Sequence, residues 1–236
     1  MARGGGVTLA IVNGDNILVQ NNTFTDALGN AVIDLEPNTP NDPITNITIT
    51  GNFIDQQGST GVIEPNTYGI VTHAAGGPYG PVTITNNLLY GAPYPWYGGW
   101  YPTGNLHAAI YLNYGGINTN NHDVENNYIQ WSGASIVVAG SNDNQIINNS
   151  VIGPNANLIV SGTNNFVLGN YVASVSSQGT YYFGIEERGA SSDHNTFIDN
   201  LTTSTGFLQQ SSTAVTMIGP HSAGFGNVVI ARPPFP

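Results

Sequence analysis

A recurring asparagine is the feature that most constrains how this chain can fold. It ends seven short phrases, such as residues 84–87 (ITNN) and 146–149 (IINN), and each phrase has an apolar residue three positions before that asparagine. The residue two positions after it is apolar in every copy except the last, which has Thr202. The seven asparagines are Asn22, Asn52, Asn87, Asn127, Asn149, Asn170 and Asn200. Such self-similarity indicates a solenoid.

The spacing of these asparagines predicts rungs of unequal length. Successive spacings are 30, 35, 40, 22, 21 and 30 residues, so a minimal rung has 21 or 22 residues and the others carry insertions. A second short apolar strand follows each asparagine, the last at 206–210, and no segment has a convincing helical period. Stacked rungs would place successive asparagines about 4.8 Å apart, so their amides could hydrogen-bond as a structural ladder. A second ladder is expected at His122, Asn144, Asn165 and Asn195.

The composition excludes several classes of partner. Three Lys and Arg residues against fourteen Asp and Glu residues give a net charge of −11, which leaves no basic patch for nucleic acid. The absence of cysteine excludes disulfides and thiolate chemistry. The chain has no run of eighteen apolar residues, so we expect no membrane insertion. It has no signal peptide at its start, so we expect a fragment of a larger chain or an oligomer.

The repeats resemble those of the pectate-lyase-like superfamily of right-handed parallel β-helices, whose rungs carry asparagine ladders at one turn. The resemblance covers residues 12–211, and residues 212–236 would form a degenerate last rung and a tail. It implies an all-β fold, a single-stranded right-handed parallel β-helix of seven or eight rungs that spans residues 1–236 as one domain. It also implies an extracellular protein, or one on a cell or virion surface, that binds or cleaves a polysaccharide.

The resemblance leaves the activity open. Members of the superfamily include polysaccharide lyases, glycoside hydrolases and alginate epimerases, but also tailspikes and other solenoids without known catalysis. The expected protein is therefore either a lyase or glycoside hydrolase acting along one outward face, or a non-catalytic structural or adhesive module. Fold alone does not choose between an enzyme and such a module.

Titratable side chains on one outward face of the first three rungs form the candidate site. Aligning the second strands by their inward apolar residues brings together Asp34, Glu36, His73, Tyr111 and Asn113. His73 and Tyr111 could act as base and acid in a lyase or epimerase, and Asn113 could bind substrate. Asp34 and Glu36, about 6 to 9 Å apart, could serve inverting glycoside hydrolysis or hold Ca²⁺. No cofactor is required, and the alternative is a set of solvated surface residues.

A loop at 90–101 is rich in aromatic residues. Tyr94, Trp96, Tyr97, Trp100 and Tyr101 are candidates for stacking on sugar rings, because their rings are flat and each carries a phenol or indole group that can hydrogen-bond to sugar hydroxyls. The alternative is a loop that packs on itself or lies in a homo-oligomer interface.

The chain departs from known enzymes of the superfamily in its lack of basic residues. Pectate lyases commonly use an arginine base, whereas no Lys or Arg lies beside this candidate site. The Asp-Pro-His-Asp pattern of alginate epimerases is also absent. A protein with a net charge of −11 repels polyuronates unless calcium bridges them, so a neutral glycan is preferred.

Overall fold

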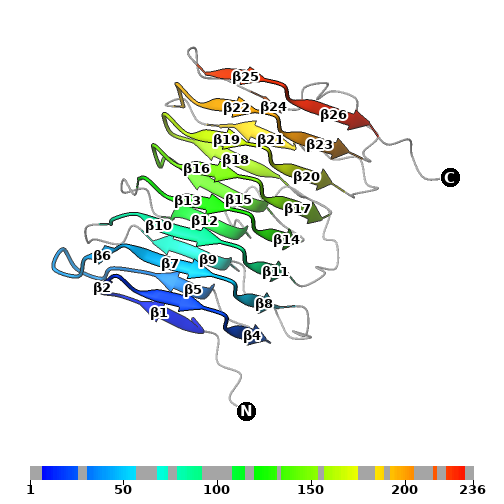
Figure 1. The fold of residues 1–236 in the computed structure, drawn as a ribbon. Coiled ribbons are helices and arrows are strands. Elements are labelled where there is room, and N and C mark those ends of the chain that lie inside the picture. Colours follow the sequence, from blue (N-terminus) through cyan, green and yellow to red (C-terminus); the bar gives the residue numbers. More distant parts are fainter. Residues whose placement is uncertain are drawn as a thin grey trace, which may run out of the picture.

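Three parallel sheets run along the whole solenoid in a computed structural model of the chain (Figure 1). The structure describes residues 7–25, 31–56, 68–73, 79–91, 108–114, 120–131, 134–153, 157–174, 184–188, 192–204, 215–216 and 222–231. Among these residues there is no helix that could cross a membrane.

Each of the three sheets has eight strands in order along the axis. The first sheet consists of β1 (Leu9–Ile11), β5 (Ala31–Leu35), β9 (Tyr68–His73), β12 (Ala108–Tyr114), β15 (Ala134–Ala139), β18 (Leu158–Ser161), β21 (Ile185–Glu187) and β24 (Val215–Thr216). The second sheet consists of β3 (Leu18–Gln20), β7 (Ile47–Thr50), β10 (Val82–Thr85), β13 (Asp123–Glu125), β16 (Gln145–Ile147), β19 (Phe166–Leu168), β22 (Thr196–Ile198) and β25 (Ala223–Phe225). The third sheet consists of β4 (Thr23–Thr25), β8 (Phe53–Asp55), β11 (Leu88–Tyr90), β14 (Tyr128–Gln130), β17 (Ser150–Gly153), β20 (Tyr171–Ser174), β23 (Leu201–Ser204) and β26 (Val228–Ala231).

The chain winds so that each turn supplies one strand to each sheet. A two-stranded pairing of β2 (Gly14–Asp15) with β6 (Ile44–Thr45) is added near the N-terminal end. All pairings between adjacent rungs are parallel, as in β5 with β9, where Ile33 lies opposite Ile70. The all-β parallel solenoid predicted from the asparagine repeat is therefore confirmed, with eight strands per sheet.

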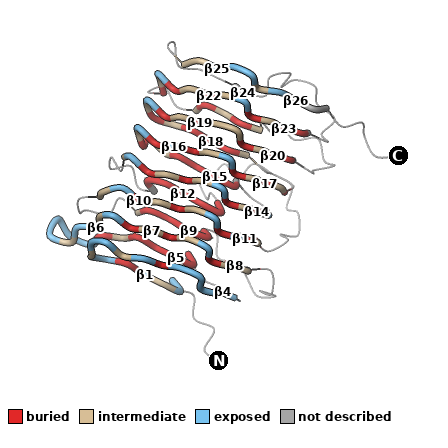
Figure 2. The backbone as a smooth tube through the Cα atoms, viewed as in Figure 1, coloured by how far each residue is buried: buried red, intermediate tan, exposed pale blue. Residues whose placement is uncertain are grey.

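Inward side chains of the three sheets form one continuous core. Figure 2 shows the buried segments lining the interior between the sheets. In the second and third sheets, buried residues alternate with more exposed ones, as in β7, because successive side chains of a strand point to opposite faces. Ile49, Ile84, Ile54 and Leu89 are among the core residues with no exposed surface.

The asparagine ladder lies at the turn between the second and third sheets. Each side-chain amide donates to the carbonyl oxygen of the asparagine in the next rung, at 2.9 to 3.0 Å. The column runs through Asn22, Asn52, Asn87, Asn127, Asn149, Asn170, Asn200 and Asn227. The last member, Asn227, extends the seven positions of the sequence repeat by one rung.

A residue with positive φ precedes each ladder asparagine and makes the turn sharp. Asn86 has φ 56° and Asn126 has φ 55°, while Gly51 and Gly169 take the same place with φ 64°. Asn and Gly are the residues that adopt this left-handed conformation most readily. The Asn-Asn and Gly-Asn pairs of the repeat therefore combine a left-handed turn residue with a buried ladder amide.

A second polar column occupies the turn before the second sheet. The Asn144 amide donates to Asn165 at 2.7 Å, and the Asn165 amide donates to Asn195 at 2.9 Å. His122 joins this column through its backbone N–H, which donates to Asn144 Oδ1 at 3.0 Å. In the earlier rungs the same position is apolar, with Ile47 and Val82.

The last rung differs from the expected alignment. The strand predicted at 206–210 lies outside the described residues. The partner of β21 is instead β24, which places Val215 opposite Ile185 and Thr216 opposite Glu186. The last strand of each sheet thus lies within residues 212–236, the stretch expected to form a degenerate last rung.

Candidate functional site

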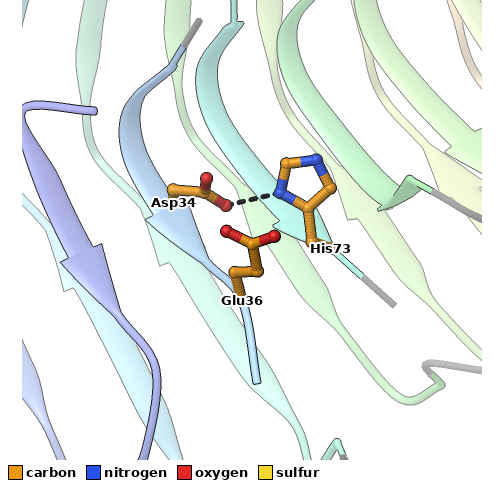
Figure 3. Close-up of side chains that lie close together, drawn as sticks. All are labelled: Asp34, Glu36 and His73. Atoms are coloured by element: carbon orange, nitrogen blue, oxygen red, sulfur yellow. Dashed lines mark hydrogen bonds and ion pairs between the residues drawn. The ribbon is translucent and has the colours of Figure 1, made fainter. Parts of the chain in front are cut away.

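An aspartate and a histidine on adjacent strands of the first sheet form the centre of the candidate site. Asp34 lies in β5 and His73 ends β9, and His73 Nδ1 lies 2.7 Å from Asp34 Oδ1 (Figure 3). A carboxylate can only accept hydrogen bonds, so Nδ1 carries the proton of this bond. The second ring nitrogen, Nε2, faces away from Asp34 in Figure 3. In the neutral imidazole, Nε2 is therefore the basic atom.

A second carboxylate lies beside this pair. Glu36 follows β5 directly, and its backbone N–H donates to the Ile11 carbonyl at 2.9 Å, which fixes the chain at this point. One ligand atom each of Asp34, Glu36 and His73 lies within 4.8 Å of the others. Three of the five side chains predicted for the site therefore converge. We name these three residues the carboxylate–histidine group.

Burial differs sharply within the carboxylate–histidine group. Asp34 is only 3% exposed, whereas Glu36 and His73 are half-buried. A buried carboxylate needs hydrogen-bond or ionic partners, and the imidazole of His73 provides one. Asp34 is thus held inside the protein, while the imidazole reaches toward the surface.

The outward column that contains Asp34 is not the open face that the sequence predicted. Its next members, Val71, Tyr111, Val137 and Ile159, are all buried, and they form a second apolar cluster outside the main core. The neighbouring column is half-buried and contains Glu36, His73, Ala139, Ser161 and Arg188. The accessible part of the site is therefore limited to the second column.

The structure places Tyr111 on the strand next to that of His73 and two strands from Asp34. Val71 lies between Asp34 and Tyr111 in the register, which puts Tyr111 two strands away, about 10 Å along the axis. Its ring packs edge-on against Tyr68 with centroids 5.5 Å apart, and the residue is 8% exposed. The role of Tyr111 as an acid in catalysis stays a prediction.

Asn113 does not occupy the predicted place beside His73. A β-bulge in β12 shifts the register, so Tyr114 pairs with His73. Asn113 takes the extra position with φ 66° and is buried; its amide donates to the Ala139 carbonyl at 2.6 Å, and its N–H donates to Thr72 Oγ1 at 2.7 Å. These contacts are typical of an asparagine that stabilises a bulge, because Asn tolerates the left-handed conformation.

Tyr79 lies near the candidate site and was missed by sequence reasoning. Its hydroxyl donates to the Leu35 carbonyl, next to Asp34 in the chain. Burial and the negative charges of Asp34 and Glu36 raise the pKa of Tyr79, so its hydroxyl stays protonated. Tyr79 follows an insertion outside the asparagine repeat, and nothing in the sequence aligns it with Leu35.

The carboxylates of Asp34 and Glu36 lie close together. Inverting glycoside hydrolysis needs carboxyl groups roughly 6.5 to 9.5 Å apart, to leave room for water. In the structure, one oxygen of Asp34 and one of Glu36 approach within 4.8 Å, and Asp34 is bonded to His73. The roles of Asp34 and Glu36 in inverting glycoside hydrolysis stay a prediction.

The carboxylate–histidine group supplies only part of a calcium coordination shell. Protein-bound Ca²⁺ takes about 6 to 8 oxygen ligands. Among the described residues, the carboxylate–histidine group offers two carboxylates and one imidazole within 4.8 Å. A calcium ion held by Asp34 and Glu36 would need backbone, water or substrate oxygens for the rest of its shell.

The predicted aromatic binding residues lie outside the part of the chain that the structure describes. These are Tyr94, Trp96, Tyr97, Trp100 and Tyr101. Their contact with substrate stays a prediction.

Comparisons with known proteins add one structural likeness. No protein family matches the sequence, and no curated protein matches it either. Among solved structures, the chain is similar to the A-module of the mannuronan C-5 epimerase AlgE6 of Azotobacter vinelandii, with 16% identity and a TM-score of 0.41. The match covers 92% of this chain, which spans 65% of the length of that module. The parallel β-helix itself is established by the strand pairings of this chain.

Proposed function

We propose that this chain acts on a polysaccharide by proton transfer at His73, in a lyase-type elimination. The observation that carries the proposal is the 2.7 Å contact between His73 Nδ1 and the buried Asp34 carboxylate. A carboxylate bonded to one ring nitrogen orients the imidazole and stabilises it after it takes up a proton at the other nitrogen. An exposed histidine without this support would lack a fixed orientation.

The elimination uses the two ring nitrogens in different roles. His73 Nε2 takes the proton from C5 of a uronate residue, and the C–H electron pair becomes a double bond between C4 and C5. The bond between C4 and the glycosidic oxygen breaks, and that oxygen takes a proton from water or from an acid on the enzyme. Asp34 remains an acceptor throughout and balances the positive charge that forms on the imidazole.

This chemistry requires a uronate at the cleaved bond, because the neighbouring carboxyl group makes the C5 proton acidic. The proposed substrate is therefore a uronate polymer, in place of the neutral glycan expected from net charge alone. The carboxylates of Asp34 and Glu36 would repel the substrate carboxylate at this point. Calcium held on the accessible side of the group, by Glu36, would supply charge neutralisation. Calcium dependence therefore belongs to the proposal, and so does action outside the cell.

A turnover assay with matched variants tests the proposal. The purified chain is incubated with polygalacturonate, alginate and a neutral glucan, with and without calcium, and both ultraviolet absorbance of unsaturated uronate and reducing ends are recorded. We expect absorbance to rise with at least one uronate polymer. His73→Ala should abolish the rise, while Ser161→Ala, in the same half-buried column, should keep it.

Two results would overturn the proposal. Reducing ends without absorbance would indicate a hydrolase, and Glu36 would then become the leading acid. Absence of any product from all polymers would support the non-catalytic structural or adhesive module instead.

A further inference from the structure

The third sheet carries large apolar and aromatic side chains on its outward face. In the register of β8, β11 and β14, Phe53 lies opposite Leu88, and Leu88 lies opposite Tyr128. Tyr90 stands on the same face of β11, two residues beyond Leu88. We name these four residues, Phe53, Leu88, Tyr90 and Tyr128, the aromatic strip.

The rings of the aromatic strip contact one another in sequence along the axis. The ring of Tyr90 lies 5.8 Å from that of Phe53 and 5.9 Å from that of Tyr128, centroid to centroid. Each ring comes from a different strand, so the spacing is set by the ladder of backbone hydrogen bonds rather than by a loop. The result is a continuous row of three rings on a rigid support.

The aromatic strip faces away from the core. The residues that alternate with it, Ile54, Leu89 and Ile129, have no exposed surface and point inward. Leu88 is 44% exposed, and the three aromatic residues are half-buried. The side of a strand that faces water usually carries polar residues. Four large apolar or aromatic side chains on this face therefore require an explanation.

We propose that the aromatic strip is a binding surface for uncharged sugar residues of a glycan. Sugar rings present C–H faces that stack on aromatic rings, and the hydroxyls of Tyr90 and Tyr128 give the strip polar ends that can hydrogen-bond to sugar hydroxyls. A row of rings along the axis suits an extended chain that lies across successive rungs. The surface lies on a different sheet from Asp34 and His73, so this proposal does not depend on their chemistry.

The charges on this surface favour an uncharged ligand. On the outward face of these strands and of the strands on either side, the strip is surrounded by Thr23, Thr25, Asp55, Gln130, Ser150 and Ile152. They include one carboxylate and no cation, so an anionic polymer finds no counter-charge there. A second copy of this chain would bring another net charge of −11 to the contact, and like charges disfavour such an association.

A binding experiment with a double variant tests the proposal. The probe is a soluble neutral β-glucan or galactomannan, and affinity electrophoresis or calorimetry gives the Kd. We expect Tyr90→Ala with Tyr128→Ala to raise the Kd by about tenfold or more. The matched control is Leu168→Ala, a half-buried outward residue of the second sheet, and it should leave the Kd unchanged.

Two further measurements keep this test separate from that of His73. His73→Ala should bind the neutral glycan as the wild type does, and circular dichroism should show that the double variant is folded. Equal binding by the double variant and the wild type, or no binding of either polymer, would overturn the proposal. Self-association of the wild type that the double variant loses would assign the strip to a contact between copies instead.

Discussion

The Nδ1 atom of His122 accepts a hydrogen bond from the backbone N–H of Val82 at 3.1 Å. In the next rungs of the same column, an asparagine Oδ1 accepts the corresponding bond, as Asn144 does from the N–H of His122. A ring nitrogen accepts only when it carries no proton. His122 therefore replaces an asparagine in the ladder only in its neutral form, and burial lowers the pKa of His122 to about 4.

Stability should fall in mild acid because of His122. The pKa is about 6.5 in the unfolded chain and about 4 in the folded protein, so between these values the unfolded state binds the proton. The free energy of unfolding should drop by roughly 2 to 3 kcal/mol between pH 7 and pH 4.5 from this group alone. Urea denaturation at the two pH values measures the loss.

The matched variant for this prediction is His122→Asn. Asparagine can accept the hydrogen bond from the Val82 N–H and does not titrate. The free energy of unfolding of the variant should therefore fall in acid by roughly 2 to 3 kcal/mol less than that of the wild type. An equal loss in both proteins would assign the acid sensitivity to other groups.

Asn127→Ala should destabilise the solenoid strongly. Asn127 Oδ1 accepts from both the backbone N–H and the amide of Asn87, and its own amide donates to the Ile84 carbonyl and to Asn149. Alanine leaves these buried groups without partners, which should cost about 3 kcal/mol or more in a thermal or urea unfolding experiment. Asn126→Gly is the control, because glycine already occupies this turn position in Gly51 and Gly169, and its effect should stay small. Similar losses in the two variants would contradict a special role for the ladder amide.

Asp34→Asn should impair turnover more than substrate binding if His73 is the base. The substitution keeps the shape of the side chain but removes the negative charge 2.7 Å from His73 Nδ1. We expect kcat to fall by about 10²-fold or more with little change in KM, since Asp34 acts through His73 and is buried from substrate. Steady-state kinetics on the polymer that serves as substrate would show the split. A rise in KM with unchanged kcat would instead indicate that Asp34 contributes to binding.

Much of the fold could be predicted from sequence because its signals are local. Each ladder asparagine, such as Asn87, comes with its own left-handed turn residue and its own inward apolar neighbours, so every rung repeats the same information. The adjacency of Asp34, Glu36 and His73 followed from that repeat, because aligned rungs bring residues far apart in sequence onto neighbouring strands. Within the residues that the structure describes, no helix interrupts the signal.

The rest of the site depends on features that interrupt the repeat. The bulge at Asn113 inserts one residue into β12, and only the pairing of Tyr114 with His73 reveals it. Tyr79 lies beyond an insertion, so its alignment with Leu35 has no counterpart in other rungs. The burial of Val71 and Tyr111 on the outward face of the first sheet depends on tertiary packing, which alternation of apolar and polar residues does not report.

The asparagine column has a direction. From Asn22 to Asn200, every side-chain amide donates to its ladder neighbour on the C-terminal side, and the last member, Asn227, accepts. Amides linked head to tail polarise one another, so their dipoles add along the axis and each bond strengthens the next. An asparagine in the middle of the column therefore contributes more to stability than the same residue at an end. Any rung that continues the column must orient its asparagine amide in the same direction.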